Sequence, residues 1–345
     1  MNPRQLGKRG IEVSALGMGC WAIGGPWSIE RDDGPSPAGW GEVDDAESMR
    51  AVQAALDAGI TFFDTAANYG CGHSERVLGE ALGSRRKDVV IATKFGHIID
   101  EETKIMKGDD DAIVGNLRQD CENSLRRLGT DYIDLYQLHA GNLDPEKAVA
   151  VRGLLEELVA EGKIRAYGWS TDLADRARVF AEGAGCASIQ FSLNLFHDNP
   201  DIISICETSG LACINKKPLA SGFLTGKFTP QTTFPENDMR TGIDFSMPRF
   251  AEMLKMAEGL RDVLTSGGRT MAQGALAWIW ARSDRTIPIP GARNDRQAKE
   301  NAAAMLHGPL SPAQFEEANR IVASVRSGDE EEKQDVPPED KRGHE

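Results

Sequence analysis

At 345 residues the chain suits one large domain, since barrels of eight strand-helix units fold around a single core at this size; two domains are the alternative. Its 40% hydrophobic and 27% charged residues are typical of a globular protein and exclude disorder throughout. The net charge of -14 argues against a nucleic-acid partner, because affinity for the phosphate backbone comes largely from Lys and Arg.

The chain carries no recognisable targeting or membrane signal. Residues 1–17, MNPRQLGKRGIEVSALG, lack the apolar run of a secretory signal, and no stretch approaches the roughly 20 apolar residues of a membrane span. Six cysteines are scattered without CxxC or metal-ligand spacing, which suits reduced thiols. We therefore expect a cytoplasmic protein.

Residues 327–345, SGDEEEKQDVPPEDKRGHE, predict an acidic, flexible tail after a single domain of residues 1–326.

Short β-branched or aromatic runs alternate with longer amphipathic stretches that carry helix-start and helix-stop signals. In chain order, the predicted strands cover residues 15–21, 61–65, 89–95, 132–139, 164–170, 188–194, 212–219 and 286–291. The helices predicted between them include residues 45–58, 74–82, 115–128, 145–161 and 296–305.

Several of these strands, such as VVIATKF and YIDLYQL, are apolar on both faces, which is typical of a parallel sheet covered by helices. Eight strand-helix units close naturally into a barrel, so the pattern predicts a (β/α)8 barrel, the TIM barrel fold. An open doubly wound sheet is the alternative. That fold places a GxGxxG phosphate loop after its first strand, and the glycines of GMGCWAIGG lack that spacing.

Two long segments rich in turn-forming residues fall outside the alternation. Residues 24–42 contain Trp27 and Trp40, and residues 228–250 contain further aromatic residues. Long loops in compact domains are often functional. They would wall a substrate pocket if they follow the carboxyl ends of the strands, but the sequence leaves open whether they lie there or at the floor of the barrel.

Polar residues stand at the carboxyl ends of the second, third and fourth predicted strands, where barrels carry their reactive groups. Asp64 ends FFD, Tyr69 follows five residues later, Lys94 ends VIATK and His139 ends LYQLH. An ammonium lowers the pKa of a neighbouring tyrosine, and a carboxylate keeps that ammonium charged and oriented. With His139 as a hydrogen-bond donor, the group suits protonation of a carbonyl oxygen by Tyr69 while a hydride reaches the carbon.

Motifs spread over residues 13–325 carry a resemblance to a known family. In order they are GMGCW, GITFFDTAANYG with SERVLGEAL, IATKFG, SLRRLGTDYIDLYQLH, LVAEGKIRAYGWST, IQFSLN, KPLASGFLTGKF, and ALAWIWA with TIPIPGARNDRQAKENAAA. Each is modest evidence alone, but their order and spacing together are highly specific. The chain resembles the aldo-keto reductases.

This resemblance implies a fold and a site. An N-terminal β-hairpin would precede the barrel, an extra helix would follow it, and Asp64, Tyr69, Lys94 and His139 match the catalytic tetrad. NADPH or NADP+ would lie across the barrel mouth without a Rossmann fold. The implied contacts are Ser170 and Gln190 with the carboxamide, Leu219, Ser221, Gly222 and Lys227 with the pyrophosphate, Arg293 and Gln297 with the 2′-phosphate, Glu300 and Asn301 with the adenine, and Cys20, Trp21, Thr171, Lys216, Pro218 and Gly291 elsewhere along the cofactor. Trp21, Trp27, Tyr69 and His139 would border the substrate.

The GAR turn before the last predicted helix offers free amides and a cation, which suits a phosphate whatever the family; a solvated surface arginine is the alternative.

Two positions depart from the family pattern. Lys216 stands where many relatives have an aromatic residue that stacks on the nicotinamide, and Thr171 where an asparagine often binds the carboxamide. If the ammonium attracts an anionic or hydroxyl-rich substrate, Lys216→Ala will raise the substrate KM; a simple ion pair with a neighbouring acid is the alternative. Together with the polar loops, Lys216 tilts the expectation toward a sugar-like or otherwise hydroxylated carbonyl compound.

Two other classes of protein compete with an NADPH-dependent reductase. A slow-turnover regulatory subunit would keep the fold and the cofactor site, but the intact tetrad disfavours it. An isomerase or hydrolase barrel that uses Asp64 and His139 would have no need for the segment GARNDRQAKEN.

His73 and His97 lack a third ligand at zinc-like spacing, so we expect no metal. The expected partners are a small carbonyl substrate, with no nucleic acid or membrane, and the expected state is a monomer or weak homo-oligomer.

Overall fold

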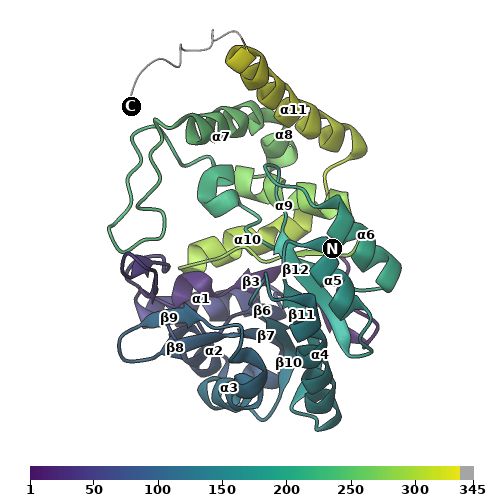
Figure 1. Cartoon of the computed structure of the whole chain (residues 1–345). Helices are drawn as coiled ribbons and strands as arrows, with labels where there is room; N and C mark the ends of the chain where they lie inside the picture. Colours follow the sequence, from purple (N-terminus) through teal and green to yellow (C-terminus); the bar gives the residue numbers. More distant parts are fainter. Residues whose placement is uncertain (335–345) are drawn as a thin grey trace.

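The computed structural model describes residues 1–334 and contains an eight-stranded parallel barrel surrounded by helices (Figure 1). The strands pair in the order β14, β13, β12, β11, β10, β7, β6, β3. A parallel bridge between Gly19 and Gly291 joins the two edges, and the Gly19 amide donates to the Pro290 carbonyl at 3.0 Å. The predicted (β/α)8 barrel is therefore confirmed.

Every predicted strand overlaps a strand of the barrel. The observed bounds are Gly17–Gly19 for β3, Phe62–Asp64 for β6, Val90–Phe95 for β7, Ile133–Leu138 for β10, Ile164–Ser170 for β11, Cys186–Ser192 for β12, Ala212–Lys216 for β13 and Thr286–Pro288 for β14. The predictions extended β3, β12, β13 and β14 too far at their carboxyl ends. There the apolar sequence continues into loops that cover the barrel mouth, so hydrophobicity alone does not mark where the pairing stops.

The helices form the outer layer. They are α1 (Asp45–Asp57), α2 (His73–Leu82), α3 (Ile113–Leu128), α4 (Pro145–Ala160), α5 (Ala174–Ala181), α6 (Pro200–Ser209), α7 (Pro248–Gly259), α8 (Arg261–Thr265), α9 (Met271–Arg282), α10 (Asp295–His307) and α11 (Pro312–Gln334). Of these, α1, α4, α6, α9 and α10 begin at a side-chain cap. Asp44 caps α1 by accepting the Glu47 amide, and Asn294 caps α10 by accepting the Gln297 amide.

A short antiparallel hairpin closes one end of the barrel. It consists of β1 (Arg4–Leu6) and β2 (Ile11–Val13). Leu6, Ile11 and Val13 are buried in one cluster with side chains of the barrel strands, among them Phe62 and Leu135. Since this hairpin seals the amino ends of the strands, a ligand can reach the interior only from the opposite end.

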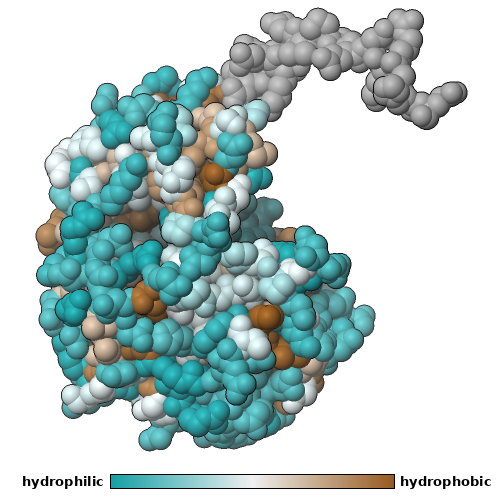
Figure 2. Space-filling view, turned by 90° about the vertical axis from the view of Figure 1, so that its left-hand side faces the viewer, coloured by the Kyte–Doolittle hydropathy of each residue, from teal (hydrophilic) through white to brown (hydrophobic). Residues whose placement is uncertain are grey.

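Both long loops lie at that opposite end. Residues 24–42 follow β3 and contain β4 (Ser28–Ile29) and β5 (Ser36–Pro37), which form a small sheet with β8 (His97–Asp100) and β9 (Ile105–Gly108). Residues 228–250 follow β13 and a short 3₁₀ turn, Ala220–Thr225. The two loops meet through an antiparallel bridge between Trp40 and Asp238. The question that the sequence left open is thereby answered: these loops lie at the barrel mouth, and the molecule is hollowed on this side (Figure 2).

Helices α7, α8 and α11 lie together on one side of the barrel (Figure 1). Helix α11 continues through Gln334, past the predicted domain end at residue 326, while residues 335–345 lie outside the described part of the chain. The division into a domain and a tail stays a prediction. No helix within residues 1–334 is long and apolar enough to span a membrane.

A buried ion pair connects α2 to α3 beside strand β7. Glu75 Oε2 accepts Arg127 Nε at 2.6 Å, Glu75 Oε1 accepts Thr93 Oγ1 at 2.5 Å, and the two charged side chains are 0% and 4% exposed. Arg127→Met leaves the Glu75 carboxylate without its cation, so we expect a loss of about 3–5 kcal/mol in the free energy of unfolding, measured by urea denaturation. Arg118→Met, which removes surface ion pairs, is the control and should cost less than about 1 kcal/mol. Equal losses in the two variants would contradict this account.

Candidate active site

The Lys94 ammonium lies at the centre of the predicted catalytic group. Its Nζ donates to Asp64 Oδ2 at 2.6 Å, to the Thr65 carbonyl at 2.8 Å and to the Tyr69 hydroxyl oxygen at 3.1 Å. Strands β6, β7 and β10 are neighbours in the barrel, so their carboxyl ends bring Asp64, Lys94 and His139 to one place. Lys94 and Asp64 are 0% and 2% exposed, and each neutralises a charge that would be costly to bury alone.

Two side-chain amides hold the other oxygen of Asp64. Oδ1 accepts Gln190 Nε2 at 2.7 Å and Gln137 Nε2 at 3.1 Å. Gln190 was expected to bind a nicotinamide carboxamide; its second amide atom, Oε1, lies 3.4 Å from the hydroxyl of Ser170. The carboxylate that orients Lys94 is thus fixed on both sides.

Burial raises the pKa of Tyr69 above its ordinary value, and the Lys94 charge offsets only part of that rise. The expectation of a lowered pKa considered the lysine alone and is wrong in its net direction, because the phenol is buried as well. Burial lowers the pKa of Lys94, but the charges of Asp64 and Tyr69 outweigh it, so the net pKa is raised. At neutral pH the site therefore holds a protonated phenol beside a charged ammonium, the state that a proton donor needs.

His139 is neutral in this environment. Burial lowers its pKa well below the ordinary value, and the charges of Lys94, His97 and Lys216 lower it further. Its Nδ1 lies 3.1 Å from Asn68 Oδ1, and a neutral imidazole holds one proton. A proton on Nδ1 bonds that oxygen and leaves Nε2 as an acceptor. If the Asn68 amide turns by half a rotation, its NH2 group donates to Nδ1 and the proton moves to Nε2.

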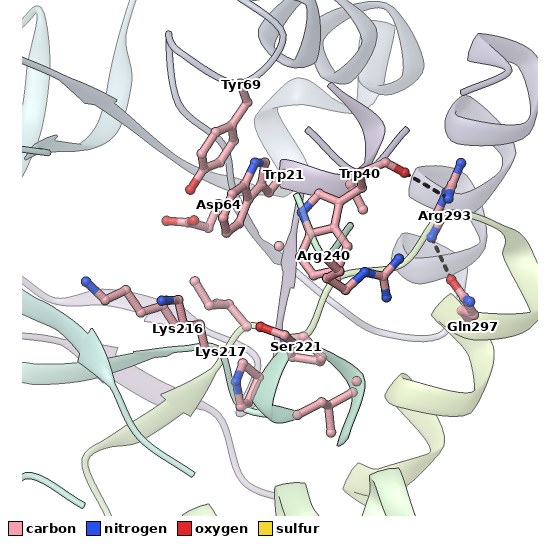
Figure 3. Close-up of a pocket in the computed structure, with 18 of the residues that line it drawn as sticks. Trp21, Trp40, Asp64, Tyr69, Lys216, Lys217, Ser221, Arg240, Arg293 and Gln297 are labelled. Atoms are coloured by element: carbon pink, nitrogen blue, oxygen red, sulfur yellow. Dashed lines mark hydrogen bonds between the residues drawn. The ribbon is translucent and has the colours of Figure 1, made fainter. Parts of the chain in front are cut away.

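A cavity of about 620 Å³ opens onto this group. Figure 3 shows Tyr69, Asp64 and Trp21 on one side, Lys216, Lys217 and Ser221 across from them, and Arg293 with Gln297 at the far end. The lining comes from strands, from the loops that follow them and from α9 and α10: Gly19, Trp21, Ala22, Trp27, Ile29, Trp40, Asp64, Asn68, Tyr69, His97, Met106, His139, Gln190, Lys216, Lys217, Pro218, Leu219, Ser221, Gly222, Thr225, Lys227, Phe228, Arg240, Ala272, Ile289, Pro290, Gly291, Arg293, Gln297, Glu300 and Asn301.

An aromatic wall adjoins the tetrad. The Trp21 ring stacks on Tyr69 with centroids 5.7 Å apart, and its Nε1 donates to the Ala38 carbonyl at 3.0 Å. Trp27 is buried in the same cluster, and Trp27, Ile29 and Met106 also line the cavity. The space beside Tyr69 and His139 therefore offers a largely apolar surface to a ligand.

The wall opposite Tyr69 and the far end of the cavity together carry the features of a phosphate site. Ala220, Ser221 and Gly222 follow one another with φ of 48°, 55° and 106°, a strained run of left-handed backbone of the kind found at ligand sites. Lys217, Lys227 and Arg293 add positive charge along the same wall. This turn and these cations fit an elongated, multiply charged anion such as a dinucleotide.

The two mouth loops are bound to each other and to Arg293 above this end. Arg240 stacks over the Trp40 ring at 4.5 Å and pairs with Asp238 at 2.6 Å. Arg293 donates to the Trp40 carbonyl at 3.1 Å and also to the carbonyl of Glu42. Its own amide donates to Gln297 Oε1 at 2.8 Å (Figure 3). The two residues expected at a 2′-phosphate thus lie together at the start of α10.

Comparison with known proteins gives the same result. The family model described as "Aldo/keto reductase family" matches residues 15–323. The chain belongs to this family. It is 31% identical over 314 residues to the NADH-specific methylglyoxal reductase of Escherichia coli, with 87% of this chain and 92% of that protein covered.

Two solved structures place this reductase among enzymes of the same fold. A glycerol dehydrogenase from Gluconobacter oxydans is 30% identical, with a TM-score of 0.76 and coverage of 97% of this chain and 96% of that one. An aldo-keto reductase from Klebsiella pneumoniae in complex with NADPH is 26% identical, with a TM-score of 0.67 and coverage of 99% and 98%. A nicotinamide cofactor is thereby supported for this family member.

Most of the residues that the resemblance implied reach the cavity of this reductase. The exceptions are Cys20, Ser170, Thr171 and Lys94, which are buried outside its lining. Thr171 donates instead to the Gly141 carbonyl at 2.7 Å. Lys216 lines the cavity and also forms an ion pair with Asp172 at 3.2 Å, as the simpler of the two hypotheses predicted. The role of each cofactor contact stays a prediction.

Sequence reasoning missed several side chains of the site. Asn68 contacts His139, Gln137 holds Asp64, and the His97 ring lies edge-on to His139 with centroids 5.2 Å apart. One of these carried a usable signal: Gln137 stands two residues before His139 in an apolar strand, so the two side chains share a face. Arg240 carried none, because its position depends on how a long loop folds.

Proposed function

We propose that this chain reduces an aldehyde or ketone to the alcohol with NADPH, with Tyr69 as the proton donor. One observation carries the proposal: the Lys94 ammonium bridges Asp64 and the Tyr69 hydroxyl, buried, at the closed end of a large cavity. A buried lysine, tyrosine and carboxylate in mutual contact, with a histidine beside them, suit proton transfer to an oxygen better than binding alone.

Each residue has a part in that reaction. NADPH, when bound, supplies the hydride to the carbonyl carbon. Tyr69 donates its proton to the carbonyl oxygen, and Lys94 stabilises the phenolate that remains. Asp64, fixed by its two amide partners, keeps Lys94 charged and in place. His139 orients the carbonyl oxygen when its proton is on Nε2, and Trp21 packs against the Tyr69 ring and limits access of water.

The preference for NADPH over NADH is part of the proposal. Arg293 and Gln297 lie together at the start of α10, where a 2′-phosphate would meet both a cation and the amino end of a helix. The Klebsiella relative in complex with NADPH supports this assignment, whereas the E. coli relative is named as NADH-specific. Titration with both nucleotides distinguishes the two.

For the substrate we propose a small hydroxylated or otherwise oxygenated carbonyl compound. The names of two relatives, a methylglyoxal reductase and a glycerol dehydrogenase, refer to small compounds of this kind. His97 and Lys216 place polar groups near His139, and the Trp21 wall would pack against the carbon skeleton.

The test is a fluorescence titration with NADPH and NADH, followed by turnover of matched carbonyl pairs such as acetaldehyde with glycolaldehyde and acetone with hydroxyacetone. We expect tighter binding of NADPH and faster turnover of the oxygenated member of each pair. Tight binding without turnover of any carbonyl would favour the regulatory alternative, and absence of binding would exclude both.

A further inference from the structure

Lys216 lies at the end of the cavity that contains the catalytic tetrad, here called the tetrad end. The proposed mechanism assigns this lysine no proton or hydride step. Lys216 is the last residue of β13, and its side chain is 26% exposed. Its Nζ lies 3.2 Å from Asp172 Oδ2, while Asp172 Oδ1 accepts the Ser192 amide at 2.6 Å. Asp172 uses one of the three donors of the ammonium, so two N–H groups remain for a ligand in the cavity that Lys216 lines.

The charge of Lys216 reaches the catalytic group. It is among the charges that lower the pKa of His139, after burial and the charges of Lys94 and His97. Burial lowers the pKa of Lys216 itself, and the negative charge of Asp172 opposes that shift. Lys94 pairs with Asp64 at 2.6 Å deep inside the barrel, whereas Asp172 lies 3.2 Å from Lys216 and is 41% exposed, so it compensates less of the Lys216 charge. Lys216, which lines the cavity beside Lys217, is therefore a cation at the tetrad end whose field acts on a ligand there.

The hydride donor has to occupy the same end of the cavity, a step that rests on the proposed function. The nicotinamide ring must touch the carbonyl carbon whose oxygen lies at Tyr69. Trp21 and Lys216 are cavity walls at this end (Figure 3), and so is Gln190, which donates to Asp64. When the hydride leaves with its two electrons, the neutral reduced ring becomes a cation.

We propose that Lys216 makes the site bind the reduced cofactor in preference to the oxidised one, and that Asp172 limits this preference. Two like charges in a partly buried cavity repel each other much more strongly than in water. The repulsion acts on NADP+ and not on the reduced ring, so it lowers one affinity selectively. It speeds the release of NADP+ after reduction, and it shifts the equilibrium among bound reactants toward carbonyl and NADPH by the same factor.

The test is the ratio of the dissociation constants of NADP+ and NADPH, measured at neutral pH by quenching of tryptophan fluorescence, with no substrate present. Trp21 and Trp40 line the cavity and supply the signal. In Lys216→Met, which keeps an unbranched side chain only one atom shorter and removes the charge, we expect the ratio to fall roughly threefold to tenfold. In Lys216→Arg, which keeps the charge, the ratio should stay within about twofold of wild type.

A second change tests the part assigned to Asp172. In Lys216→Arg, the further substitution Asp172→Asn keeps an acceptor for the Ser192 amide and removes the compensating charge, so the ratio should rise. A Lys216→Met variant that retains the wild-type ratio, or weakens both nucleotides equally, would overturn the inference and leave the proposed function intact. If the wild-type protein bound neither nucleotide, the proposed function would fall with it.

Discussion

Replacing Tyr69 with phenylalanine is expected to lower kcat for carbonyl reduction by between about 10²-fold and about 10⁴-fold, while the affinity for NADPH changes by less than about threefold. The substitution removes the proton that is transferred to the carbonyl oxygen in the proposed mechanism. It keeps the ring that stacks on Trp21, and Lys94 keeps its bonds to Asp64 and to the Thr65 carbonyl. The measurement is kcat at saturating NADPH together with a fluorescence titration.

The barrel supplies a matched control for this variant. Tyr136 is buried in β10, and its hydroxyl has no hydrogen-bond partner among the described residues. Tyr136→Phe therefore removes the same atom from a barrel strand without touching the cavity, and kcat should stay within about twofold of wild type. If Tyr69→Phe turned over as fast as Tyr136→Phe, Tyr69 would not be the proton donor.

Alternation of apolar strands with amphipathic helices was enough to predict the barrel. A strand that is buried on both faces, such as Val90–Phe95, is recognisable because nearly all of its residues are apolar. The carboxyl ends of those strands then located Asp64, Lys94 and His139, since neighbouring parallel strands end on one side. The mouth loops lack any such periodicity. Trp27 and Trp40 marked them as unusual, but only tertiary contacts fix which end of the barrel they cover.

The protonation state of the site could not be predicted from the sequence either. The adjacency of Lys94 and Tyr69 predicted a lowered pKa for the phenol, whereas the depth of burial decides the net direction. The pairing of Lys216 with Asp172 follows the same logic: the two residues come from the ends of different strands and are 44 positions apart. The sequence pattern shows on which face of a strand a side chain lies. Its charge state depends on burial and on its distance from other charged groups, which only the folded barrel determines.

Asn68→Asp tests the hydrogen bond that sets the protonation of His139. A carboxylate can only accept, so it holds the proton of a neutral imidazole on Nδ1 and leaves a lone pair on Nε2, facing the carbonyl oxygen. At pH values where His139 is neutral we expect kcat for reduction to fall by about 10²-fold. The added negative charge raises the pKa of His139, and protonation restores an Nε2 donor. Activity should therefore recover as the pH is lowered through that pKa.

Wild type should show no such recovery, because burial and nearby cations keep the pKa of His139 well below its ordinary value. Asn68→Leu serves as the control, since it removes the partner of either tautomer and adds no charge. We expect a smaller loss of kcat in that variant, without the dependence on pH. An Asn68→Asp enzyme with the wild-type rate and pH profile would mean that His139 does not donate to the substrate. Tyr69 and Lys94 would then polarise the carbonyl without it.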